Sequence, residues 1–389
     1  MSTGQVRELL SRLVQCPSVN PADRQAFENP FGEARLAELL AELMRSWGAA
    51  VQVMQVRPGR PNVLARFEGP AGSPTLMFEA HSDTVSAEGM TVPPFEALVR
   101  DGKLFGRGAC DTKGSMAAML LGIRRLLDEP GGLPVTVLFA STCGEELGAM
   151  GAKALVAAGL RADAVLVGEP TDLAVVHASK GVVRLSVQTR GRAAHSSDPA
   201  LGTNAIYHMR RVLEAVETEL APALERRGHP QLGAPTICVG TIAGGTQANI
   251  VPDRCRVQID RRTLPAERPA DVVAELLAPL DRLRGQVSGF DYVARYEEQF
   301  PPLWTDPQAP LARLVCRACQ DVLGRFELAG AAWASNAAVF AAAGMPAVLL
   351  GPGSIRQAHT AGEYVELEAV ARAAEVYARV IRLFGAPEG

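Results

Sequence analysis

Four short segments of this chain, each largely or wholly apolar, are followed by acidic or imidazole side chains. This pattern constrains the fold more than any other feature. The segments are residues 76–80, 135–140, 164–168 and 347–351. Such segments are typical of strands buried on both faces of a parallel sheet. Ligands bind outside the carboxyl ends of the strands in sheets of this kind, so we expect the polar side chains that follow the segments to meet at one site.

Helical patterns separate these segments. Residues 36–47 place leucine, methionine and tryptophan at helical spacing, and residues 115–127 form a second pattern rich in alanine, leucine and methionine. Strands that alternate with helices predict an α/β fold, with a mostly parallel sheet covered by helices on both faces.

The pattern changes near residue 180. From there to residue 296 the order is strand, helix, strand, strand, helix, strand, and the strands alternate apolar with polar residues, as at Val257 and Ile259. Alternation indicates a sheet with one face in water. We therefore expect an inserted α+β module of split βαβ type, a lid or dimerisation domain at residues 180–296. The catalytic, metal-binding domain would then be discontinuous, formed by residues 1–179 and 297–389.

Composition excludes several classes of protein. The 389 residues carry a net charge of -3 and no run of lysine and arginine, which argues against binding of nucleic acid. The amino terminus has a helical pattern without the apolar region of a signal peptide, and the seven scattered cysteines are typical of reduced thiols, so we expect a cytoplasmic protein. Residues 328–355 carry no charge, but Asn336, Gly344 and Pro346 interrupt them, which favours a buried helix and strand over a membrane span.

The polar residues after the apolar segments form a set typical of metal sites. In a strand His81 and Asp83 point the same way, which suits an imidazole ligand oriented by a carboxylate. The other members of the set are Asp111, Glu145, Glu146, Glu169 and His359. Taken singly each could be structural, and paired glutamates are common at a solvated helix start. Together, imidazoles and carboxylates suit zinc, cobalt or manganese, and the excess of carboxylates favours two ions about 3.5–4 Å apart.

The same residues carry a family resemblance that spans nearly the whole chain. The matching segments are HSDTV (81–85), GRGACDTKG (106–114), the glutamate pair, GEPT (168–171) and GPGSIRQAHTAGEYVEL (351–367). The chain resembles the dinuclear-zinc amidohydrolases and peptidases, which include acetylornithine deacetylase, succinyl-diaminopimelate desuccinylase, aminoacylases and glutamate carboxypeptidases. It is most similar to the acetylornithine deacetylase branch, through residues 194–206 and the end of the GPGS segment.

The resemblance implies a role for each residue at the metals. It implies two zinc ions, for which cobalt or manganese could substitute. One ion would have the ligands His81, Asp111 and Glu169, and the other would have Asp111, Glu146 and His359. Asp83 would orient His81, and Glu145 would be the general base that takes a proton from the attacking water.

Residues of the inserted module complete the implied site. His195 would donate a hydrogen bond to the developing oxyanion in the active site of a partner subunit, so the resemblance implies a homodimer. Arg262 would bind a substrate carboxylate, although the adjacent Arg261 is an alternative. Asn249 and Asn336 occupy positions that match substrate-binding positions.

The implied reaction is hydrolysis of the amide bond of an N-acyl amino acid, a small-molecule substrate, with acetylornithine first and a place in arginine biosynthesis. Relatives often have acidic residues at the positions of Gly144 and Asn336, which leaves the substrate side chain open. The alternatives are a desuccinylase, another acyl-amino-acid deacylase, or a dipeptidase or carboxypeptidase. A serine hydrolase or nucleotide-binding enzyme is disfavoured because their motifs are absent, and a non-catalytic binding protein because the polar set is intact.

Overall fold

The computed structural model describes residues 1–22 and 29–386, without the side chains of residues 298 and 299. Packing divides the chain into two compact units. The first unit contains Met1–His177, Trp304–Ala329 and Ser335–Gly389, and the second contains Ala178–Leu303 and Gly330–Ala334. The assignment of a catalytic domain and a lid or dimerisation domain stays a prediction, because compactness alone gives neither unit a role.

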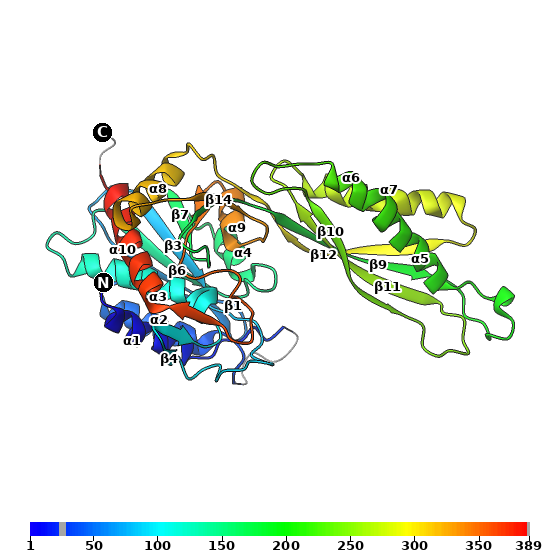
Figure 1. The fold of residues 1–389 in the computed structure, drawn as a ribbon, viewed down its shortest axis with the longest axis horizontal. Coiled ribbons are helices and arrows are strands. Elements are labelled where there is room, and N and C mark those ends of the chain that lie inside the picture. The colour runs from blue at the N-terminus through cyan, green and yellow to red at the C-terminus, as the bar shows by residue number, and fades with distance from the viewer. Residues whose placement is uncertain (23–28, 387–389) are drawn as a thin grey trace. The chain divides into compact units, whose positions relative to one another are not determined.

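The larger sheet has the strand order β1-β2-β6-β3-β7-β15-β8-β13, with β14 beside β8 (Figure 1). Its strands are β1 (Ala50–Arg57), β2 (Arg60–Phe67), β3 (Thr75–His81), β6 (Thr136–Thr142), β7 (Ala164–Val167), β8 (Val175–Ser179), β13 (Leu303–Trp304), β14 (Leu328–Ala331) and β15 (Ala347–Leu349). The central strands β6, β3, β7 and β15 are parallel to one another. β1, β2 and β6 pair antiparallel, as do β15 and β8. The predicted parallel sheet is confirmed at its centre, and it is the centre that delivers the polar side chains.

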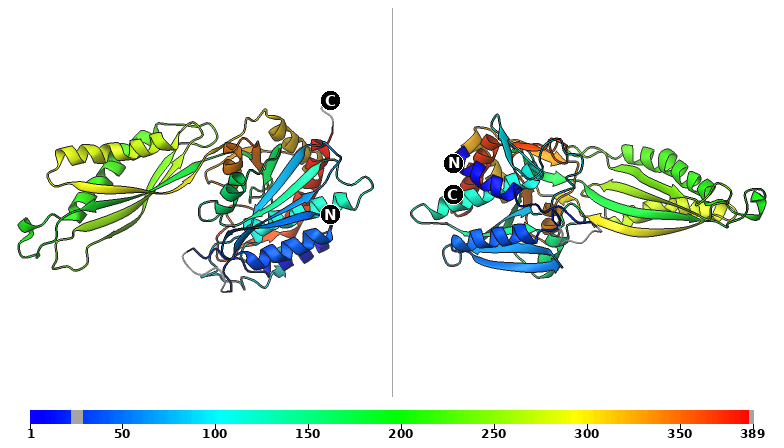
Figure 2. Two further views of the ribbon diagram at one scale, coloured as in Figure 1. Left: turned by 180° about the vertical axis from the view of Figure 1, so that it is seen from behind. Right: turned by 90° about the horizontal axis from the view of Figure 1, so that it is seen from below.

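Helices cover this sheet. The helices that share one hydrophobic core with it are α1 (Thr3–Val14), α2 (Ala34–Ser46), α3 (Gly114–Leu127), α8 (Pro310–Leu323) and α10 (Leu367–Phe384). α3 and α10 pack side by side at the centre of this layer (Figures 1 and 2). α4 (Met150–Ala157) and α9 (Asn336–Ala342) contact each other and the sheet without joining that core. The predicted α/β architecture is therefore confirmed.

A small antiparallel sheet of β4 (Leu98–Arg100), β5 (Lys103–Phe105) and β16 (Tyr364–Glu366) joins distant segments of the chain. Tyr364 pairs with Phe105, so the residues before β16 lie beside the glycine-rich loop that follows β5. That loop leads through the turn η1 (Ala109–Lys113) into α3. The sheet thus brings the segment before β16, part of the motif at residues 351–367, next to Asp111.

The second unit has the predicted order of elements. These are β9 (Gly181–Arg190), α5 (Ala205–Ala215), α6 (Ala221–Glu225), β10 (Thr236–Gly244), β11 (Arg254–Thr263), α7 (Pro269–Gln286) and β12 (Asp291–Phe300). Its sheet is antiparallel, in the order β10-β11-β9-β12. Apolar residues of β9 and β11 pack with α5 and α7, while Arg256 and Gln258 on the opposite face are exposed. The helix expected over residues 203–225 is divided into α5, the turn η3 (Val216–Leu220) and α6.

The uncharged residues 328–355 form β14, α9 and β15, so the expected buried helix and strand are present. Within residues 1–22 and 29–386, no helix has both the length and the apolar character needed to cross a membrane.

Candidate metal centre

His81 is the last residue of β3 and is only 2% exposed. Its Nδ1 lies 2.9 Å from the backbone carbonyl oxygen of Asp83, and its Nε2 lies 2.9 Å from Oδ1 of Asp111. A carbonyl oxygen can only accept, so Nδ1 carries the proton that it donates, and Nε2 is the nitrogen directed at the carboxylate. This arrangement is typical of a histidine that binds a metal through Nε2.

Asp111 lies between two imidazoles that come from opposite ends of the sequence. Its Oδ1 contacts His81, and its Oδ2 lies 3.2 Å from Nε2 of His359. Burial alone would raise the pKa of Asp111, but the hydrogen bonds with His359 and His81 outweigh burial and hold that pKa well below its usual range. A carboxylate whose two oxygens face different histidines could serve two cations at once.

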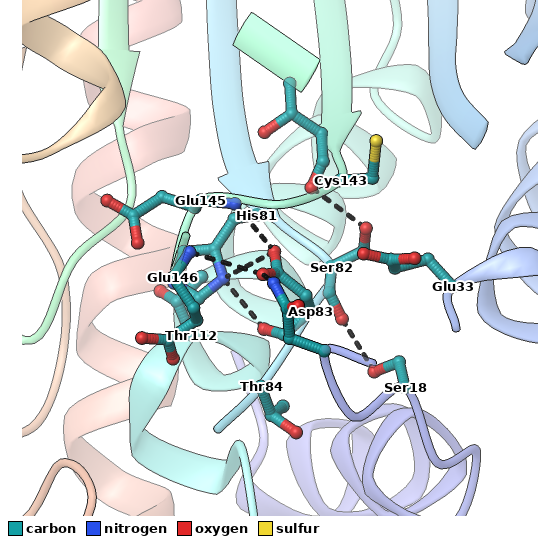
Figure 3. A network of polar contacts seen from close by, with 12 residues as sticks. Ser18, Glu33, His81, Ser82, Asp83, Thr84, Thr112, Cys143, Glu145 and Glu146 are labelled. Carbon is teal, nitrogen blue, oxygen red and sulfur yellow. Dashed lines mark hydrogen bonds and ion pairs between the residues drawn. The ribbon is translucent and has the colours of Figure 1, made fainter. Parts of the chain in front are cut away.

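The glutamate pair follows β6, where Asp83 fixes its backbone (Figure 3). Oδ1 of Asp83 accepts from the N–H of Glu145 at 3.0 Å, and Oδ2 accepts from the N–H of Glu146 at 3.2 Å. The carboxylate of Glu146 lies 3.2 Å from Nε2 of His359. The carboxylate of Asp83 therefore fixes the loop of Glu145 and Glu146, and the backbone carbonyl of Asp83 fixes His81. The carboxylate itself is 3.7 Å from Nδ1 of His81. The helix after this loop begins only at Met150.

His81, Asp111 and Glu146 each offer a ligand atom within 4.8 Å of the others. Glu169, which follows β7, is 4% exposed. Burial raises the pKa of Glu169 well above its usual value, and the charges of Asp111 and Glu145 raise it further. Burial likewise raises the pKa of Glu145 and of Glu146. The nearby imidazoles do not offset burial and mutual repulsion in these carboxylates, and a set of carboxylates with imidazoles fits a divalent transition metal, so the donor set suits a cation.

The comparisons agree with this geometry. The model of "Peptidase family M20/M25/M40" matches residues 77–383. The acetylornithine deacetylase of Myxococcus xanthus is 33% identical over 320 residues, which cover 81% of each chain. The chain belongs to the M20/M25/M40 peptidase family. It is therefore a metal-dependent hydrolase of amide bonds.

Solved structures of M20 proteins share the fold. The aminopeptidase PepT of Bacillus cereus ATCC 10987 has a TM-score of 0.81 and 23% identity, covering 99% of this chain and 100% of that chain. The Bacillus subtilis YXEP protein, a dinuclear metal binding peptidase from the M20 family, has a TM-score of 0.72 and 16% identity, covering 97% of each chain.

His195 and Asn249 of this M20 chain lie on adjacent segments of the second unit, where both are exposed. The N–H of Ser196 donates to the carbonyl oxygen of Asn249 at 3.0 Å. Nδ1 of His195 accepts from the N–H of Ser197 at 3.1 Å, and it lies 2.8 Å from the Ser197 hydroxyl. Since Nδ1 is an acceptor, the proton of the neutral ring is on Nε2, which leaves an exposed donor.

The two adjacent arginines of β11 have different environments. Arg261 is 0% exposed, and its Nη2 donates to Oε1 of Glu267 at 2.6 Å. Arg262 has a side chain that is 30% exposed, and its Nε donates to Oδ1 of Asp260 at 2.7 Å. Arg261 is thus enclosed with its own carboxylate, and Arg262 is the one that solvent can reach.

Asn336 lies at the start of α9 and is only 1% exposed. Its amide donates to Oε1 of Glu79 at 2.9 Å and to the hydroxyl of Thr142 at 3.0 Å. Asn336 thus contacts β3 and β6 from within the protein, and its predicted role in substrate binding stays a prediction.

Sequence reasoning missed the residues that surround this M20 site. Asn20 donates to Oδ2 of Asp83 at 2.7 Å, and Nη2 of Arg60 lies 3.9 Å from the same oxygen. Arg60 also forms a buried ion pair with Glu33, at 2.5 Å. A second buried pair joins Arg107 to Glu363. None of these residues belongs to a periodic sequence pattern that would have predicted its contact. The only signal for the pair of Arg107 and Glu363 is that both residues lie inside the family motifs.

Proposed function

We propose that this protein hydrolyses the amide bond of N-acyl amino acids, with acetylornithine as the first candidate substrate, in the cytoplasm. The observation that carries the proposal is the position of Asp111 between His81 and His359, with Glu146 on the second histidine. Similarity to an acetylornithine deacetylase over most of both chains supports the substrate class.

Two zinc ions are proposed, for which cobalt or manganese can substitute. His81, Asp111 and Glu169 would hold one, and Asp111, Glu146 and His359 the other. The separate oxygens of Asp111 support a shared ligand, and the YXEP protein of the same fold is a dinuclear metal binding peptidase. Bound cations supply two effects, a lower pKa for water and polarisation of the amide carbonyl.

Glu145 is proposed to move the proton. Its backbone N–H is held by Asp83, and burial raises the pKa of its carboxyl group well above the usual value. A carboxylate with a raised pKa is a stronger base, and a pKa nearer the working pH lets one group both accept a proton and give it up again. Glu145 would take a proton from the attacking water and deliver it to the nitrogen of the leaving amine.

Arg262 is proposed to bind the α-carboxylate of the substrate, because its guanidinium is the accessible one of the two and can bind a carboxylate through two hydrogen bonds. Asn249 is proposed to lie at the same site. Asn336 is proposed to act on the substrate side chain from its buried position beside Glu79, which leaves the identity of that side chain open.

A homodimer through the second unit is also proposed. β10 is an edge strand of its sheet, and an unpaired edge can pair with the same edge of a second copy. Ile242 on β10 is 57% exposed, and Ile206 and Tyr207 at the start of α5 are 38% and 69% exposed, which supplies apolar surface for such a contact. The exposed Nε2–H of His195 would then donate to the oxyanion in the partner's active site.

Complementation tests the dimer. A Glu145→Gln subunit and a His195→Ala subunit should each be nearly inactive. After mixing and reversible dissociation, heterodimers should contain one site with both groups intact, and random pairing gives up to about a quarter of wild-type activity. Heterodimers confirmed by mass that remain inactive would mean that His195 does not act across the interface.

A substrate panel tests the function itself. Metal-free protein reloaded with zinc or cobalt should be assayed on acetylornithine, other acetyl- and succinyl-amino acids, and dipeptides. The proposal expects the highest kcat/KM on acetylornithine and much lower values on dipeptides. A preference for dipeptides would instead make the protein a peptidase on the same scaffold.

A further inference from the structure

Glu363 is a buried carboxylate, 1% exposed, directly before β16. Its oxygens accept from three backbone N–H groups of one loop: Gly108 at 3.1 Å, Cys110 at 2.9 Å and Asp111 at 3.1 Å. The guanidinium of Arg107, from the same loop, donates to it at 2.6 Å. The side chain of Glu363 thus accepts hydrogen bonds from three N–H groups of the loop that carries Asp111.

This loop needs an external acceptor because its backbone is irregular. Gly108 has a φ of 82°, and Asp111 has φ -119° and ψ 91°, which is not helical. Buried N–H groups without an acceptor are costly, and no strand supplies one to Cys110 and Asp111 here. A buried carboxylate is itself costly unless it is paired, and Arg107, 3% exposed, supplies the opposite charge.

Arg107 also donates hydrogen bonds to two other segments, one of which carries His359. Its Nε donates to the carbonyl oxygen of Ser86 at 3.0 Å, and its Nη1 donates to that of Thr360 at 3.3 Å. Thr360 directly follows His359, whose side chain is about half exposed. The Arg107–Glu363 pair therefore fixes both the loop of Asp111 and the loop of His359.

We propose that Glu363, together with Arg107, is the positioning residue that sets Asp111 against His359, and so controls the cation held by Asp111, Glu146 and His359. This inference rests on the proposed ligand roles. Both cations would share Asp111, so the difference between them should come from the histidines. Arg107 contacts Thr360 beside His359, whereas His81 is fixed by β3 and by the carbonyl of Asp83, and the cation at His81 should therefore depend on Glu363 less.

The test is a cobalt titration of metal-free Glu363→Gln, with binding followed by equilibrium dialysis and by the visible absorption of bound cobalt. Glutamine keeps the shape but directs an NH2 group at two donors. Affinity for one of two cobalt ions should fall by about 10- to 100-fold, the range for groups that support a ligand, while the other ion binds nearly as in the wild type. At saturating cobalt, kcat should fall more than KM rises.

The matched control is Glu366→Gln, which removes an exposed carboxylate at the end of β16, three residues from Glu363, where it lies 4.0 Å from Nζ of Lys103. It should bind cobalt as the wild type does. Glu363→Asp, which keeps the charge but has a shorter reach, should give an intermediate affinity. If Glu363→Gln does not fold, Arg107→Lys tests the same pair, because lysine keeps the charge but cannot reach Ser86 and Thr360 together.

Wild-type affinity and absorption in a folded Glu363→Gln, or in Arg107→Lys when the first variant does not fold, would overturn the inference. So would an equal loss of both ions, since that result indicates general disorder of the site. If the wild type itself binds no cobalt, the proposed metal centre is wrong. That outcome is distinct from failure of the inference about Glu363, which requires a wild type that binds two ions and a variant that binds them equally well.

Discussion

The two histidines of the metal centre have opposite supports. His81 ends a buried strand, is 2% exposed, and has its ring fixed by a carbonyl acceptor. His359 lies in a loop at a φ of 62°, with a side chain that is 51% exposed and contacts only Asp111 and Glu146 among the described residues. We call the part of the site around His81 the strand side and the part around His359 the loop side. The position of His81 is fixed by its strand, whereas the position of His359 depends on the carboxylates of Asp111 and Glu146 and on the cation that they bind.

The largest expected effect is a difference in role between the adjacent residues Glu145 and Glu146. Glu145→Gln cannot accept a proton, so kcat should fall by about 10²- to 10⁴-fold while bound metal is retained. Glu146→Gln removes a charge from the His359 side and should mainly weaken metal binding. Steady-state kinetics and metal analysis of both variants provide the measurement; exchanged phenotypes would reverse the assignment of base and ligand.

The adjacent arginines of β11 repeat the contrast between a buried and an accessible group. Arg261→Ala removes a fully buried guanidinium and one of the two arginines that pair with Glu267, which keeps Arg227 at 3.1 Å, so the free energy of unfolding should fall by about 1–3 kcal/mol. Arg262→Ala should instead raise KM about tenfold or more for substrates with a free carboxylate, because a hydrogen bond to a charged group contributes about 1.5–3 kcal/mol. Urea denaturation and kinetics on acids and their amides separate the two; equal KM changes on acid and amide would make Arg262 structural.

Removal of each histidine should sharpen the difference between the strand side and the loop side. In metal-free protein, His81→Ala leaves buried partners without hydrogen bonds and should lower the free energy of unfolding by about 1–3 kcal/mol. His359→Ala changes an exposed side chain, and above about pH 10, where its contacts with Asp111 and Glu146 no longer hold a proton, its effect should stay within about 0.5 kcal/mol. Chemical denaturation with chelator present measures both. A larger loss for His359→Ala would show that the loop is more organised than this account holds.

The last expected effect is a pH dependence of the stability of metal-free protein, which comes from His359. Hydrogen bonds with Asp111 and then Glu146 raise the pKa of His359 from 6.5 to about 10. The folded state therefore binds a proton that the unfolded state has lost, and this stabilisation is present below pH 6.5 and disappears as the pH rises to about 10. Metal-free protein should lose stability over this window, and zinc-loaded protein much less, because the cation replaces the proton. Thermal unfolding at several pH values is the measurement, and stability that rises with pH in chelator would contradict it.

Much of the strand side could be predicted from the sequence. Apolar segments identify buried parallel strands, and parallel strands place their carboxyl ends at one edge, which is why His81 and Glu146 could be assigned to one site before the structure was seen. Asp111 came from the glycine-rich motif, and its position beside His81 agrees with that assignment.

The supports of the loop side could not be predicted. Glu363 accepts from backbone N–H groups that are 252 to 255 residues away in the sequence, and a hydrogen bond to a backbone group leaves no periodic pattern in the sequence. Burial of Asn336 was missed for a related reason. The sequence alone does not distinguish an asparagine that binds substrate from one that pairs with a buried acid such as Glu79. The roles of His195, Asn249 and Arg262 stay predictions.

The most direct test of the central claim, metal-dependent hydrolysis at the Asp111 site, is activity as a function of metal content. Protein should be dialysed against chelator, checked by elemental analysis, and reloaded with zinc or cobalt in steps while acetylornithine hydrolysis is measured. Metal-free protein should have no activity, and activity should rise to a plateau at about two ions per chain, as expected for a two-metal site. Full activity in a sample shown to be metal-free would contradict this claim.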